Sequence, residues 1–228
     1  MKEKKEKEPY VAPDRPGYRT VDLTTKFGIG NILGTVLAAV LFGACAGIAF
    51  LLFGHGLMDR LDTLDDEFVV PVGSWIAGFG VKAYTAVVIA KILYVVAWVL
   101  FIMLLSFIHE VIHVSTWAIF LGKNRKKGML SMGIHGLTPY ARCSCDTSVP
   151  GTFWGALMPM IVLGLIPFII ACIIGSPLLA IEGAFGLSAG GGDLLAGAKM
   201  VKYLRVKGAV AADSPERLGC VVYIPENA

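Results

Sequence analysis

Two histidines and a glutamate form an H-E-x-x-H sequence at positions 109–113. At helical spacing, His109 and His113 share one face, so both imidazoles can bind the same metal ion. Glu110 follows His109 and is rotated from it by about 100° around the helix. It can therefore take a proton from a metal-activated water without binding the ion itself. This division of roles predicts a zinc site with Glu110 as the catalytic base.

The segment around the motif is strongly apolar, which argues against a chance match. Residues 92–108 contain no charged side chain, and the helical pattern continues to about Leu121. A carboxylate and two imidazoles at membrane depth cost a few kcal/mol unless they face a polar cavity or a partner. An ionisable cluster in such a helix therefore indicates a functional site.

The composition is that of a membrane protein with several spans. Of the 228 residues, 56% are hydrophobic and only 16% are charged, and the mean hydropathy is +0.71. The chain is long enough for about four spanning helices of about 20 residues each. The net charge of +3 is small and spread along the chain, so we expect no nucleic-acid partner.

We predict an all-α transmembrane fold with four helices, in which the lipid bilayer surrounds a membrane domain of residues 27–207. A polar, disordered tail of residues 1–26 precedes this domain, and a short tail of residues 208–228 follows it. We expect a solvated loop at 54–83. The connection between the second and third spans is predicted to form a short loop that can fold as a β-hairpin beside the site. The spans are expected at about residues 27–53, 84–121, 153–175 and 177–204.

The distribution of Lys and Arg predicts the orientation. The N-terminal tail has seven, the first connection two, the second five, the third none, and the end of the chain from Lys199 has five. Positively charged connections lie on the cytoplasmic side. This alternation therefore predicts a multi-pass protein of the cell membrane with both termini in the cytoplasm.

A catalytic zinc site needs a third protein ligand in addition to the two histidines. His109 lies about twelve residues before the inner end of the second span, and Asp193 lies eleven before that of the fourth, so their depths are similar. The glycines at 190–192 would let the fourth span approach the second closely. The alternative is a glycine-rich kink whose aspartate faces water or caps the next helix. The candidates are Asp193, Glu182 (about 16 Å further out), His135, Asp146 and the pair Cys143 and Cys145.

These features together resemble the "putative zincin peptidase" family of small membrane proteins, and more distantly the site-2 intramembrane metalloproteases. The resemblance covers about residues 85–225 and rests on the H-E-x-x-H motif, a basic loop, Leu-Met-Pro-Met at 157–160 and Gly-Gly-Asp-Leu-Leu around Asp193. It implies that His109, His113 and Asp193 bind zinc and that Glu110 is the base. The chain departs from the site-2 proteases, since no N-P-D-G-like motif surrounds Asp193.

The sequence thus predicts a zinc metallopeptidase that cuts a peptide or membrane-protein substrate near the cytoplasmic face. His135, in the loop after the motif, is a candidate oxyanion or substrate contact. The main alternative is a non-catalytic membrane protein that binds zinc for structure, sensing or transport, for which Glu110 would be dispensable. Haem ligation is disfavoured because two histidines four residues apart on one helix cannot bind opposite faces of the ring.

Overall fold

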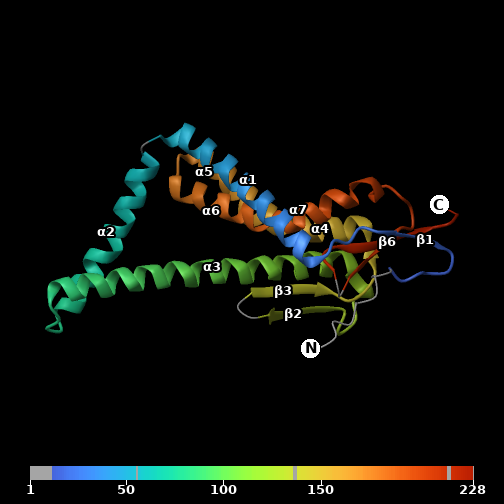
Figure 1. Ribbon diagram of the computed structural model, residues 1–228, viewed down its shortest axis with the longest axis horizontal. Coiled ribbons are helices and arrows are strands. Elements are labelled where there is room, and N and C mark those ends of the chain that lie inside the picture. The colour runs from blue at the N-terminus through green and yellow to red at the C-terminus, as the bar shows by residue number, and fades with distance from the viewer. Residues whose placement is uncertain (1–11, 55, 136–137, 215–216, 228) are drawn as a thin grey trace, which may run out of the picture.

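The computed structural model describes residues 12–54, 56–135, 138–214 and 217–227, and it is predominantly helical (Figure 1). Three helical segments are long and apolar enough to cross a membrane, and a pair of helices bent by 53° makes a fourth candidate. The segments are α1 (Phe27–Phe53), α3 (Ala83–Leu121), α4 (Val149–Met160) continuing into α5 (Ile166–Ile174), and the bent pair α6 (Pro177–Ala189) and α7 (Gly191–Met200).

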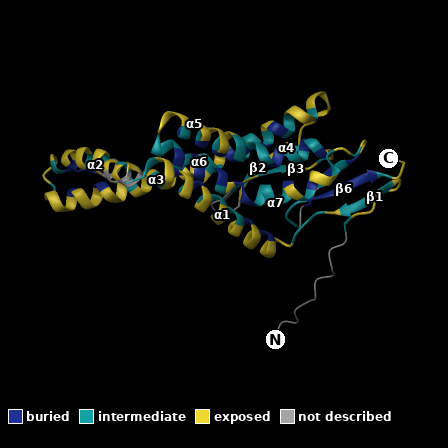
Figure 2. Cartoon of the chain, turned by 90° about the horizontal axis from the view of Figure 1, so that it is seen from above, coloured by how far each residue is buried: buried dark blue, intermediate teal, exposed yellow. Residues whose placement is uncertain are grey.

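Many large apolar residues of these helices are exposed. Figure 2 shows that exposed residues (yellow) lie along much of α1 and α3. Leu51 on α1 is 85% exposed and Ile173 on α5 is 77% exposed. A soluble protein rarely exposes such continuous apolar surface, whereas lipid tails cover it without cost. The exposed faces are thus consistent with a membrane protein.

The third segment contains one π-helical turn, Ile161–Leu165, between α4 and α5. The turn precedes Pro167, which has no N–H for the normal helical hydrogen bond. Glycines of α6 pack directly on it: a Cβ at Gly186 would lie 2.0 Å from the carbonyl oxygen of Leu163. The π-helical turn is therefore part of the contact with α6.

The connection predicted as a solvated loop contains a long helix instead, α2 (Gly56–Ala77). Apolar residues recur at helical spacing at 57, 61, 64 and 68, and this amphipathic pattern is sufficient for a helix. Helix α2 packs against the first half of α3, where the rings of Phe68 and Tyr94 lie 5.5 Å apart. The acidic residues between the apolar positions hid the pattern.

The all-α prediction is wrong, because both tails contribute to a four-stranded antiparallel sheet. Its strand order is β1 (Tyr18–Asp22), β6 (Cys220–Pro225), β5 (Val210–Asp213) and β4 (Thr147–Ser148). Residues 18–22 are thus ordered in β1 rather than disordered, while residues 1–11 of the predicted tail lie outside the described residues. The sheet buries the apolar run at 221–224 together with Val149 and Met200, next to α4 and α7.

The β-hairpin predicted between the second and third spans is present. It consists of β2 (Leu130–His135) and β3 (Thr138–Cys143), paired in register from Leu130 with Cys143 to His135 with Thr138. The hairpin lies along the second half of α3, with β3 making the closer approach (Figure 1). It therefore flanks the segment that carries the H-E-x-x-H motif.

Candidate metal centre

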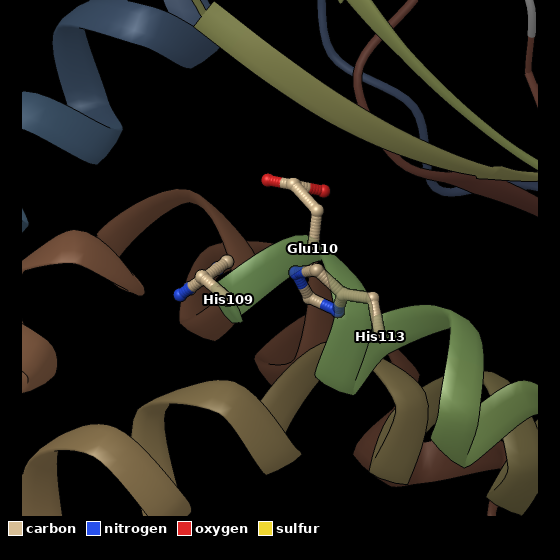
Figure 3. A group of neighbouring side chains, drawn as sticks. All are labelled: His109, Glu110 and His113. Carbon is tan, nitrogen blue, oxygen red and sulfur yellow. The ribbon is translucent and has the colours of Figure 1, made fainter. Parts of the chain in front are cut away.

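Helix α3 supplies two histidines and a glutamate to one site. His109 and His113 are buried, with 8% and 6% of their surfaces exposed. One ligand atom from each of His109, Glu110 and His113 lies within 4.8 Å of the others. In Figure 3 the three side chains leave one stretch of the helix, and Glu110 extends toward the neighbouring strand. The spacing thus gives the shared site that the sequence predicts.

Asp193, in the first turn of α7, reaches both histidines. Its Oδ2 atom lies 3.1 Å from Nε2 of His109 and 3.6 Å from Nε2 of His113. Ligands bound tetrahedrally to zinc at about 2.0–2.1 Å are about 3.3 Å from one another. The distances from the carboxylate oxygen to the two ring nitrogens bracket this value, so Asp193 lies where a zinc ligand shared with either histidine would lie. Asp193 contacts both ring nitrogens, which favours it over Glu110 as the third ligand.

The glycines before Asp193 bring α7 against α1 and α4, not against α3 as we expected. A Cβ at Gly191 would lie 2.4 Å from the carbonyl oxygen of Gly34 on α1, and one at Gly190 would lie 2.8 Å from Cβ of Met160. The fourth span therefore approaches the first, and the aspartate side chain spans the remaining distance to α3. The cap of α7 is Gly190, with no side-chain cap hydrogen bond, which argues against the helix-capping alternative for Asp193.

This contact predicts a difference between neighbouring glycines. We expect Gly191→Ala to push α7 away from α1 and to move Asp193, because overpacking costs about 1–3 kcal/mol. Zinc affinity should fall by about tenfold and the thermal unfolding temperature in detergent should drop. Gly192→Ala is the matched control, since a Cβ there meets nothing within 4 Å. Equal losses of zinc affinity in the two variants would contradict this explanation.

A backbone carbonyl holds the His113 ring. Its Nδ1 atom lies 2.6 Å from the carbonyl oxygen of Gly155 on α4, and this acceptor requires the proton on Nδ1. The lone pair of Nε2 is then free for a metal. Trp117 stacks on the other side, with ring centroids 5.4 Å apart and an interplanar angle of 16°. Gly155 leaves room for this indole, since a Cβ at that position would lie 1.9 Å from its Nε1.

The ring of His109 lacks the backbone hydrogen bond that holds the ring of His113. Its Nδ1 atom is buried, and within the described part of the chain it has no hydrogen-bond partner. Metal-ligating histidines usually donate the second ring N–H to a neighbour. His109 therefore departs from the usual pattern, and its position depends on α3 and on the contact with Asp193.

The hairpin holds the glutamate. The carboxylate of Glu110 accepts a hydrogen bond from the backbone N–H of Ala141 on β3. This contact, like the carbonyl of Gly155, was missed from the sequence because a backbone atom has no residue-type signature. The contact between Trp117 and His113 could have been predicted from the sequence, because the two residues are four positions apart and so share one helix face.

The site lies between two cavities. A large one of about 1340 Å³ and a smaller one of about 370 Å³ are both lined by His109 and Glu110. The smaller one also includes Asp193, and no described Lys or Arg lines either cavity. Asp213 lines the smaller cavity as well, and carboxylates without a Lys or Arg beside them are costly in an apolar region. A divalent cation bound by the histidines and Asp193 would offset this charge.

The other predicted ligand candidates lie elsewhere. Asp146 forms an ion pair with Arg15, with 2.5 Å between the atoms. The sulfurs of Cys143 and Cys145 are 3.4 Å apart, and burial raises the pKa of Cys143 to about 12, which keeps this thiol protonated. Glu182 lines only the large cavity. The backbone of His135 ends β2 near the tip of the hairpin, and its side chain lies outside the described residues.

Comparison with known proteins gives one match. No curated protein and no solved structure matches the chain. Residues 102–205 match the family model described as "Putative zincin peptidase". The matched segment includes His109, Glu110, His113 and Asp193, which the structure brings to one site. The match confirms the resemblance predicted from the motifs: residues 102–205 of the chain are similar to the family of "Putative zincin peptidase" proteins.

Proposed function

We propose that this protein is an intramembrane zinc metallopeptidase that hydrolyses a peptide bond near the cytoplasmic face of the cell membrane. The observation that carries this proposal is the spacing of Nε2 of His109, Nε2 of His113 and Oδ2 of Asp193, with the Glu110 carboxylate beside them. Two histidines, a carboxylate and a separate glutamate are the donor set of hydrolytic zinc enzymes.

Each side chain has a distinct role in this reaction. A zinc ion held by His109, His113 and Asp193 would polarise the scissile carbonyl and lower the pKa of a water molecule toward about 7. Glu110 accepts the proton of the attacking water and then donates it to the leaving amine. The N–H of Ala141 holds this carboxylate in place between the two transfers.

The pairing of the terminal strands supports four membrane crossings rather than three. Strand β1 comes before α1, and its partner β6 comes after α7. Two paired strands lie on one side of the membrane, so the chain between them crosses an even number of times. The count of basic residues then favours the cytoplasm for the sheet and for both termini.

Metal removal tests the proposal directly. We expect the detergent-purified protein to contain zinc in an equimolar amount and to cleave apolar fluorogenic peptides. A chelator such as 1,10-phenanthroline should abolish cleavage, and added zinc should restore it. Metal analysis and peptide mass spectrometry provide the two readouts. A protein that holds zinc but hydrolyses no peptide would favour a structural, sensing or transport site, and a protein without zinc would refute the metal centre.

A further inference from the structure

The large cavity extends well beyond the metal centre. It lies between α3 on one side and α1 and α6 on the other, and in Figure 1 α3 diverges from the packed pair of α1 and α6. Its lining is mostly apolar and includes Trp98 and Ile102 of α3 and Phe185 of α6, and it reaches His109 and Glu110 at the inner end. A substrate segment bound here would therefore lead directly to the proposed reaction site.

The charge in this cavity is unbalanced. Its charged lining residues are two carboxylates, Glu110 and Glu182. Glu182 lies on α6, is half-buried, and has no hydrogen bond or ion pair with any residue that the structure describes. Ion pairs between side chains normally offset the cost of an acid in a membrane-spanning segment. A cation that pairs with Glu182 would therefore have to come from outside the residues that line the cavity.

Solvation at the outer membrane surface is the simpler explanation for Glu182. The residue lies six positions after Ser176, which caps α6, so it is about 9 Å along the helix from that end. The cavity argues for a ligand, because Glu182 lines it together with Leu178, Ile181 and Phe185, and these apolar neighbours disfavour water. Glu182 thus combines an unpaired charge with a space large enough for a bound chain.

We propose that Glu182 binds a basic side chain of the substrate and so fixes which peptide bond reaches the metal centre. This inference rests on the proposed peptidase function and names its substrate class: an apolar segment with one Lys or Arg. Eleven residues separate Glu182 from Asp193, which corresponds to about 16 Å or less because α6 and α7 are bent by 53°. An extended chain covers this distance in about five residues.

The substrate segment must be extended near the cut, because a helix hides its carbonyl groups in its own hydrogen bonds. The basic residue is then expected about five positions from the scissile bond. Since Glu182 is a carboxylate and no described Lys or Arg lines the cavity, an acidic residue at that position would be rejected.

A binding measurement tests the carboxylate separately from catalysis. The probes are labelled apolar peptides of Leu and Ala in detergent micelles, with a single Lys or with norleucine in its place. The host is Glu110→Gln, and Glu182→Gln is added to it. We expect the lysine to tighten binding by about tenfold or more in the first protein and to have no effect in the second.

Two further variants control for charge and folding. Glu67→Gln removes an exposed carboxylate of α2, paired with Arg60, and should leave the lysine preference intact. Glu182→Asp keeps the charge and should retain part of the preference. Equal affinity for the lysine and norleucine peptides in the Glu110→Gln protein would overturn the inference.

Cleavage by the wild type separates this inference from the proposed function. As the lysine is moved along the peptide, the cut should follow it at a fixed spacing of about five residues. Cleavage that ignores the lysine would overturn the role of Glu182 and leave the peptidase intact. Lysine-dependent binding with zinc present but without cleavage would instead overturn the peptidase and leave the cation site.

Discussion

Glu110→Gln should hold zinc normally and lose peptide cleavage. The amide has nearly the shape of the carboxylate but cannot accept a proton, so the attacking water is not deprotonated and the leaving amine is not protonated. Loss of a positioned general base costs about 10²–10⁴-fold in rate. The measurement is kcat on a fluorogenic apolar peptide, with zinc content determined on the same preparation.

The zinc content decides how a loss of activity in Glu110→Gln is interpreted. Equimolar zinc with lost cleavage would assign the proton transfers to Glu110. A full rate in this variant would refute that assignment and leave a zinc site without a catalytic base. Loss of zinc from this variant would instead indicate that Glu110 is a ligand. This outcome is a real alternative, because a ligand atom of Glu110 lies within 4.8 Å of those of the histidines.

Asp193→Asn should remove zinc. The asparagine side chain is similar in size and keeps a hydrogen-bonding oxygen, but it has no negative charge. Since even residues that only orient zinc ligands contribute about 10–100-fold to affinity, we expect at least a 10²-fold loss here. Competition with a chromophoric zinc chelator measures this change. Cleavage should fall in proportion to the zinc bound.

The choice of asparagine distinguishes a ligand from a helix cap. Asparagine is as good a cap as aspartate, so a residue that only stabilised the start of α7 would tolerate the change. Normal zinc affinity in Asp193→Asn would therefore refute the ligand role. Asp146→Asn is the matched control, because this carboxylate pairs with Arg15 and should not affect zinc.

Local sequence patterns determined the helical part of the fold. The first predicted span, residues 27–53, coincides with α1, and the second differs from α3 by one residue at its start. Both follow from long apolar runs bounded by polar residues and glycine, which need no tertiary partner to be recognised. The histidine pair was equally local, because four residues on a helix fix a common face. Helix α2 was missed although its periodicity was present.

The sheet could not be predicted from either tail alone. Strand β1 pairs with β6 across almost the entire chain, so each strand lacks its partner in any local window. The apolar run at 221–224 was visible, but its burial under β1 and against α4 depends on how the helices bring the two ends together. Whether a segment forms a strand depends on the strand that pairs with it, and a local stretch of sequence does not show which distant segment that is.

The sequence by itself determined that this chain has several apolar spans and that His109, Glu110 and His113 share one helical site. Only the tertiary structure decided what surrounds them. Asp193 reaches the histidines because glycine lets α7 pack on α1, while Gly155 and Ala141 hold His113 and Glu110 through backbone atoms. Such contacts depend on close approach between segments that are distant in the sequence. Neither the absence of a side chain at glycine nor a backbone hydrogen-bonding group produces a residue pattern from which the contact could be predicted.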